Sequence, residues 1–394
     1  MQRKETKPIR IGGQFNIYSV ALLLNEKHVV SGDDEGKIRR WRVEDGEEVG
    51  MPMDVRNDVL SIAVSRDGKW IVSGTKNGLV TVWNAESGEK VTEFKGHREY
   101  VRAVDVSPDG RRIATSSDDK TACIWSLSTG KRLLGPLEHD NWVVDAKFSP
   151  DGCLIATATW HPDCGSVRVY EDDRLLVDVN IYVKSIWDKP LAWASDPKQL
   201  FVLSRSYMNC LDTSTGTTLS KWPIHSRQNP QCIALANDGA FIAASAGSSV
   251  SFWSTATHKR VGPVIELTHG IDTMAISSNH DLVVAGKNTI SVRTLCNILP
   301  LSYFDVVSTH SSILMRWISD HKSLTSHIQD DGSSTFVHTL THGFSSISLD
   351  KQEPQQNAHQ ENDSLIQSLR AQQENLSVSI ATLTHNLLGT TSPR

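Results

Sequence analysis

The chain has 394 residues, 39% apolar and 22% charged, which is typical of a globular protein rather than a disordered one. Its formal net charge of −5 argues against broad attraction to nucleic acid or to an anionic membrane. The N-terminal segment lacks the apolar core of a signal peptide, and the longest apolar stretch, residues 20–24, is too short to span a bilayer. Six scattered cysteines form no C-x-x-C pair. We therefore expect reduced thiols, a cytoplasmic or nuclear location and no membrane partner.

Two sequence features repeat with the same spacing of 42 residues. Tryptophans close short apolar runs at Trp41, Trp83 and Trp125. Asp-Gly pairs recur at residues 67–68, 109–110 and 151–152. Two independent features that share one period indicate a repeated structural unit.

Each period carries the pattern of four short strands. In the third period, alternating apolar residues at 101–106 precede an Asp-Gly turn, and a second apolar segment at 113–116 precedes a polar turn at 118–120. A third segment ends at Trp125, and a Thr-Gly turn leads to the last strand. This pattern predicts a four-stranded antiparallel meander, which is one blade of a β-propeller.

The later periods keep the spacing although the tryptophan is not always present. Tyr170, Leu211, Trp253 and Arg293 stand at its place. Seven third strands predict an all-β, seven-bladed β-propeller of four-stranded antiparallel sheets over residues 8–297. The outer strand of the last blade is expected from residues 7–11, with residues 301–306 as the alternative, because a closed ring leaves no open sheet edge.

The repeats resemble those of the WD-repeat family. The residues that carry the resemblance are Gly96-His97, Ser107-Pro108-Asp109-Gly110, Asp119-Lys120-Thr121 and Ile124-Trp125. The resemblance implies a hydrogen-bonded relay of four side chains, which only the third repeat has complete: His97, Thr115, Asp119 and Trp125. The fourth repeat offers His139, Thr157, Asp163 and Tyr170. We interpret the relay as structural, and not as a catalytic triad, because its polar groups satisfy one another.

A partner surface is expected on the loops of the third and fourth blades. Its predicted centre is Tyr100, Arg102, Trp142 and Trp160, because aromatic and arginine side chains are enriched at interface centres. Three extra residues between Thr157 and Tyr170 lengthen a turn of the fourth blade. Trp160 is therefore either an exposed anchor for a partner or a side chain that folds back onto its own blade.

The sequence shows no constellation that would carry chemistry. Residues 160–164 bring His, Asp and Cys together, but no second cluster completes a zinc site, so no metal, catalytic residue or cofactor is expected. We expect a non-enzymatic scaffold that presents propeller loops to protein or peptide partners, with nucleic acid unlikely as a direct partner. The alternatives are a propeller associated with ribonucleoprotein or chromatin, and the sensor-like propeller of a multidomain signalling system.

The period stops before the C-terminal part of the chain. Residues 298–362 are predicted to form an irregular or disordered linker. Residues 363–388 predict an amphipathic helix with apolar residues at Leu369, Leu376, Ile380, Leu383 and Leu387. Three roles stay open for this helix: packing on the propeller, self-association as a coiled coil, or binding another chain.

Overall fold

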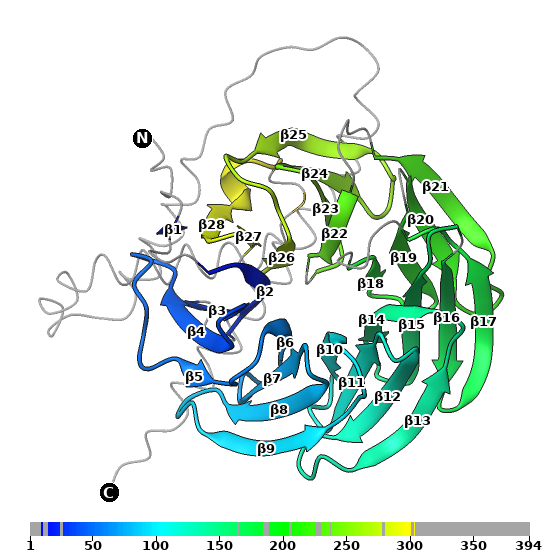
Figure 1. Cartoon of the computed structure of the whole chain (residues 1–394). Helices are drawn as coiled ribbons and strands as arrows, with labels where there is room; N and C mark the ends of the chain where they lie inside the picture. The colour runs from blue at the N-terminus through cyan, green and yellow to red at the C-terminus, as the bar shows by residue number, and fades with distance from the viewer. Residues whose placement is uncertain are drawn as a thin grey trace, which may run out of the picture. The chain divides into compact units, whose positions relative to one another are not determined.

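The computed structural model describes residues 9–10, 15–23, 27–163, 165–183, 189–204, 207–224, 230–236, 238–277, 280–300 and 303. All of them lie in one compact unit, Met1–Met315. They form seven four-stranded antiparallel sheets arranged as a ring (Figure 1). The seven-bladed propeller expected from the repeats is confirmed. The predicted helix 363–388 and residues 304–362 of the predicted linker lie outside the described residues.

Blades 1 to 4 each consist of consecutive strands, numbered from the centre of the ring outward (Figure 1). Blade 1 contains β2 (Ile17–Leu22), β3 (His28–Asp33), β4 (Lys37–Arg42) and β5 (Met53–Asp54). Blade 2 contains β6 (Val59–Val64), β7 (Trp70–Thr75), β8 (Leu79–Asn84) and β9 (Lys90–Lys95). Blade 3 contains β10 (Val101–Val106), β11 (Arg112–Ser117), β12 (Thr121–Ser126) and β13 (Arg132–Glu138). Blade 4 contains β14 (Trp142–Phe148), β15 (Leu154–Trp160), β16 (Ser166–Glu171) and β17 (Arg174–Asn180).

Blades 5 and 6 follow the same order, and blade 7 combines both ends of the repeat array. Blade 5 contains β18 (Leu191–Trp193), β19 (Gln199–Leu203), β20 (Tyr207–Asp212) and β21 (Thr218–Pro223). Blade 6 contains β22 (Pro230–Leu235), β23 (Phe241–Ala246), β24 (Ser249–Ser254) and β25 (Arg260–Glu266). Blade 7 contains β26 (Thr273–Ile276), β27 (Asp281–Gly286) and β28 (Thr289–Thr294), with β1 (Ile9–Arg10) as its outer strand.

The ring closes through the N-terminal segment. Ile9 of β1 pairs with Ile290 of β28, so the first of the two candidate segments completes blade 7. The first strands of neighbouring blades contact each other around the ring, and β26 contacts β2. After β28, a 3-10 helix (Leu295–Asn297) leads to Leu299, which is buried against blade 6. Ordered structure therefore continues slightly beyond residue 297.

The hydrophobic core lies between adjacent blades rather than within one of them. Trp83 of blade 2, for example, packs in one cluster with Ile38 and Met53 of blade 1. The Asp-Gly turns join the first and second strands, and Gly110 has a φ of +69° there. No atom would touch a side chain at Gly110, so backbone conformation alone explains the glycine.

Candidate functional site

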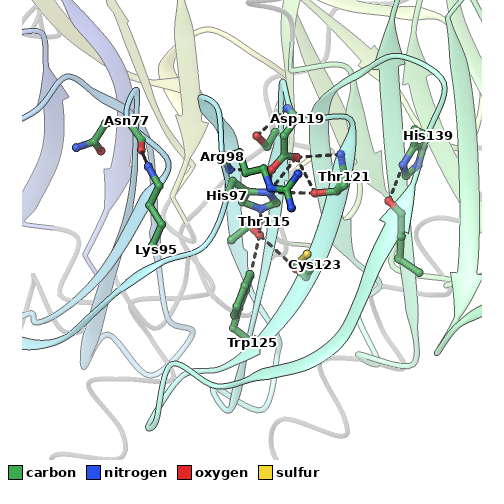
Figure 2. A network of polar contacts seen from close by, with 12 residues as sticks. Asn77, Lys95, His97, Arg98, Thr115, Asp119, Thr121, Cys123, Trp125 and His139 are labelled. Atoms are coloured by element: carbon green, nitrogen blue, oxygen red, sulfur yellow. Dashed lines mark hydrogen bonds and ion pairs between the residues drawn. The ribbon is translucent and has the colours of Figure 1, made fainter.

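Four side chains of blade 3 form one continuous hydrogen-bonded relay (Figure 2). His97 Nδ1 lies 2.9 Å from Asp119 Oδ2, and His97 Nε2 lies 2.6 Å from Thr115 Oγ1. The indole Nε1 of Trp125 donates to the same Thr115 hydroxyl at 2.8 Å. His97 is buried and Thr115 is fully buried. The relay links the segment before β10 to the second and third strands of the blade.

Asp119 is held as a charged hydrogen-bond acceptor. Burial alone would raise its pKa, but the hydrogen bond and charge of His97 reverse this effect, and the pKa lies well below the usual value. The Thr121 hydroxyl and the backbone N–H of Arg98 also donate to the carboxylate, at 2.6 and 3.0 Å. The hydroxyl of Thr115 is engaged by both His97 and Trp125. This geometry locks the turn between β11 and β12.

Blade 4 has a reduced version of the relay. In blade 4, His139 Nε2 lies 2.9 Å from Thr157 Oγ1 and 3.4 Å from the hydroxyl of Tyr170. Its Nδ1 lies 2.9 Å from the carbonyl of Leu137, which takes the place that an aspartate has in blade 3. Asp163, named from the sequence for this role, is exposed in the turn after β15.

Blade 1 contains a substitute for the relay that the sequence analysis missed. Trp41 donates to Ser31 at 2.8 Å, as the repeat predicts, but Gly13 stands where the histidine would be. The guanidinium Nε of Arg39 instead donates to the buried carboxylate of Asp33 at 2.9 Å. The sequence does contain a signal for this ion pair: Arg39 stands two residues before Trp41, the repeat tryptophan of blade 1.

The predicted partner residues lie on one face of the ring, where the first strand of each blade begins. We call the surface formed there by Tyr100, Trp142 and Trp160 the aromatic face. Trp142 and Trp160 pair across β14 and β15, and their rings stack with centroids 5.3 Å apart. Trp160 ends β15 and packs on its own blade, while Trp142 remains 37% exposed.

Arg102 is buried and supports the aromatic face from below. Its guanidinium binds Asp118 through two hydrogen bonds, at 2.7 and 2.5 Å, and only 4% of the residue is exposed. It also lies 5.0 Å from the ring centroid of Tyr100. The ammonium of Lys76 lies 5.6 Å from the same centroid and pairs with Asp58. Two cations therefore lie close to the ring of Tyr100.

A buried ionic cluster joins the first strands of blades 3, 4 and 5. The ammonium of Lys189 donates to the carbonyls of Arg102 and Val144. Burial lowers its pKa to about 8, although the charge of Asp145 opposes this shift. Asp145 is fully buried and accepts the backbone N–H of Leu191 at 3.2 Å. The sequence analysis did not single out these residues, because the strands that bring them together are far apart in the chain.

Among the residues that the structure describes, no group of three or more His, Cys, Asp or Glu side chains is placed to hold a metal ion. Cys164 of the sequence candidate lies outside these residues. No described helix is both long and apolar enough to cross a membrane.

Comparison with known proteins identifies the repeat and the fold. Residues 54–84, 88–126 and 131–171, which make up most of blades 2 to 4, match the family model described as "WD domain, G-beta repeat". No curated protein matches the sequence. Among solved structures, "Structure of U3-55K" is 18% identical and covers 75% of this chain and 98% of its own, with a TM-score of 0.64. "Crystal structure of RRP9 WD40 repeats" is also 18% identical and covers 75% and 97%, with a TM-score of 0.63. At this identity, the likeness shows a shared fold.

Proposed function

Because this chain is a seven-bladed WD-repeat β-propeller, we propose that it acts as a non-enzymatic scaffold that binds protein or peptide partners. The contact surface is the aromatic face, where Tyr100, Trp142 and Trp160 meet the partner and Arg102 holds Tyr100 in place. The scaffold works in the cytoplasm or nucleus. Cys123, Cys153 and Cys210 are free thiols, which fits a reducing compartment.

The observation that carries this proposal is the stacked pair of Trp142 and Trp160. A tryptophan that is 37% exposed, yet fixed by a stacking partner across the strand pair, loses little conformational entropy when a partner covers it. Such rigid aromatic residues are enriched among those that dominate binding energy. The relays of blades 3 and 4 hold the loops of this face in place from below.

The sequence leaves two alternatives open: a ribonucleoprotein- or chromatin-associated propeller, and a sensor-like propeller of a multidomain signalling system. A nucleic-acid surface needs uncompensated cations. On the described part of the aromatic face, Lys76 pairs with Asp58 and Arg102 pairs with Asp118. These two cations are thus neutralised, and the stacked tryptophans favour a protein or peptide as the direct partner.

The proposal is tested with the double variant Tyr100→Ala, Trp142→Ala in the full chain. Proximity labelling with quantitative mass spectrometry compares its partners with those of the parent. Truncation of a residue at the centre of an interface typically costs ~2 kcal/mol or more of binding free energy. We therefore expect the recovered amount of each specific partner to fall by at least tenfold. Arg102 is left unchanged because its buried ion pair supports the blade.

The matched control is Leu219→Ser, which removes an exposed apolar side chain from the circumference of blade 5. It should retain the partners of the parent. Circular dichroism must show the same fold for all three proteins. A folded double variant that recovers every partner at the parent's yield would place the interaction elsewhere.

A further inference from the structure

At several junctions between blades, a turn of the following blade contacts the preceding blade. This turn joins the third and fourth strands and lies on the outer strand of the preceding blade. A methyl group added at Gly130, in the blade 3 turn, would lie 2.6 Å from Phe94 of β9. His258, in the blade 6 turn, stacks on Trp222 of β21 with ring centroids 4.5 Å apart. At both places, a residue of the turn contacts an aromatic side chain of the outer strand, while the second residue of that strand, Val91 or Leu219, stays 47% or 53% exposed.

Blade 4 departs from this arrangement because its turn is two residues shorter. In blade 3 the paired residues Trp125 and Arg132 flank the turn, seven positions apart. In blade 4 the corresponding pair, Tyr170 and Leu175, is five positions apart. Only residues 172–173 remain between the last paired positions, so this turn is too short to cover the outer strand β13 as its counterparts cover theirs.

An open groove of about 580 Å³ lies at this junction, lined by residues of β13, β16 and β17 and of the turn between the last two strands. β13 and β17 lie on the circumference of the ring (Figure 1). Its apolar walls include Leu133, Leu134, Tyr170 and Leu175. Leu133 is 56% exposed and Leu175 is 46% exposed. Aliphatic side chains exposed to this extent in a concave site gain hydrophobic free energy when a ligand covers them.

At blade 6, a side chain from outside the four-stranded sheets covers the position that corresponds to Leu133. Val261 is the second residue of β25, as Leu133 is of β13, yet only 3% of Val261 is exposed. Leu299, from the segment after β28, packs in one cluster with Val261 and Leu295. An aliphatic side chain on a short, non-repetitive segment is therefore an occupant that this kind of groove accepts.

The rim of the open groove is acidic. Glu138 and Asp173 border it and are exposed. The guanidinium of Arg168, also at the groove, is already bound by Asp178 at 2.9 Å and by Asp140 at 3.3 Å. The remaining charge at the rim is thus negative, and it favours a cationic residue next to the aliphatic side chain of the occupant.

We propose that this groove is a second docking site, which binds a short segment of a partner protein with a leucine-sized side chain next to a lysine or arginine. The aliphatic side chain packs against Leu134 and Tyr170, and the cation lies beside Glu138 and Asp173. The groove is on the circumference, whereas the surface of the proposed function is on the aromatic face. The two sites can therefore be occupied, and tested, separately.

The test is selection of a phage-displayed library of random nonapeptides on the full chain. The expected result is an enriched class with Leu, Ile or Met next to Lys or Arg. A fluorescein-labelled peptide of this class should bind the parent, and Leu133→Ser should weaken its binding at least tenfold. Leu219→Ser is the matched control, because Leu219 is also the second residue of an outer strand and is 53% exposed. It should bind as the parent does.

A second variant closes the groove without changing its leucines. Residues 171–174 are replaced by the blade 3 turn, residues 126–131, which should abolish binding. The double variant Tyr100→Ala, Trp142→Ala should bind the peptide normally, so failure at one site is distinguishable from failure at the other. Three results would overturn the proposal: no enriched class of peptides, an enriched class of acidic peptides, or equal binding of the labelled peptide by Leu133→Ser and the parent. A dimer of the chain that Leu133→Ser dissociates would assign the groove to a second copy instead.

Discussion

At the scale of single residues, the polar side chains of blade 3 satisfy one another. Thr115 receives the indole N–H of Trp125 and contacts His97, which contacts Asp119 in turn. Removing one member leaves buried partners without their hydrogen bonds, and such groups are costly in a protein interior. The relay therefore contributes to the stability of the blade and to the placement of the loop that carries Tyr100.

Asp119→Ala should lower the free energy of unfolding by about 1–3 kcal/mol, because it leaves His97 and the backbone N–H of Arg98 without their acceptor. Urea denaturation followed by circular dichroism measures the change. Asp163→Ala, in the exposed turn of blade 4, is the control and should unfold like the parent. Identical midpoints for Asp119→Ala and the parent would contradict a stabilising role of the relay.

The stability of the protein should depend on the protonation of His139. Burial, helped by the charge of Arg168, lowers its pKa from 6.5 to about 4. Between these values the folded chain binds fewer protons than the unfolded chain. The contribution of neutral His139 to the free energy of unfolding is therefore complete above pH ~6.5. It is lost as the pH falls toward 4, by up to about 3 kcal/mol. Denaturation at several pH values should show this slope, and His139→Gln should reduce it. If the free energy of unfolding of His139→Gln and of the parent changed equally with pH, His139 would not be the titrating group.

At the scale of strands and turns, the 42-residue period also determines contacts between blades. The Ser19 hydroxyl accepts the backbone N–H of Ile62 at 3.0 Å, and one period later Ser61 accepts that of Val104 at 3.1 Å. Ala103 is next in this series and has no hydroxyl. Blade 3 instead uses a carboxylate two residues further along, Asp105, to reach blade 4. The shortened turn of blade 4 is a similar local departure, and it leaves a groove open.

At the scale of the whole molecule, every described sheet has four strands only because β1 joins blade 7. The pairing of Ile9 with Ile290 connects residues from opposite ends of the repeat array. Without β1, β28 would be an edge strand with unpaired backbone groups. A covalent connection from β1 to blade 1 thus fastens the last blade to the first.

Deletion of residues 1–10 should lower the free energy of unfolding by about 1–2 kcal/mol, because it removes the backbone hydrogen bonds of β1. Deletion of residues 1–6 keeps β1 and serves as the control. Thermal and urea denaturation compare the two proteins with the parent. If both deletions unfold at the midpoint of the parent, the pairing of β1 contributes nothing to ring stability.

The sequence by itself determined the features that recur locally: the strand pattern, the Asp-Gly turns, the number of blades and the four relay residues of blade 3. Each depends on residues within one period, where spacing translates directly into strand and turn. It also named the residues of the aromatic face, but not the burial of Arg102 under it.

Only the tertiary structure decided which segment completes blade 7, how Lys189 and Asp145 come together, and which junction stays open. The length of the blade 4 turn is visible in the sequence. Its effect on β13 is not, because it depends on how two blades pack. Each of these features depends on contacts between distant strands that occur once in the molecule, so they do not recur with the 42-residue period.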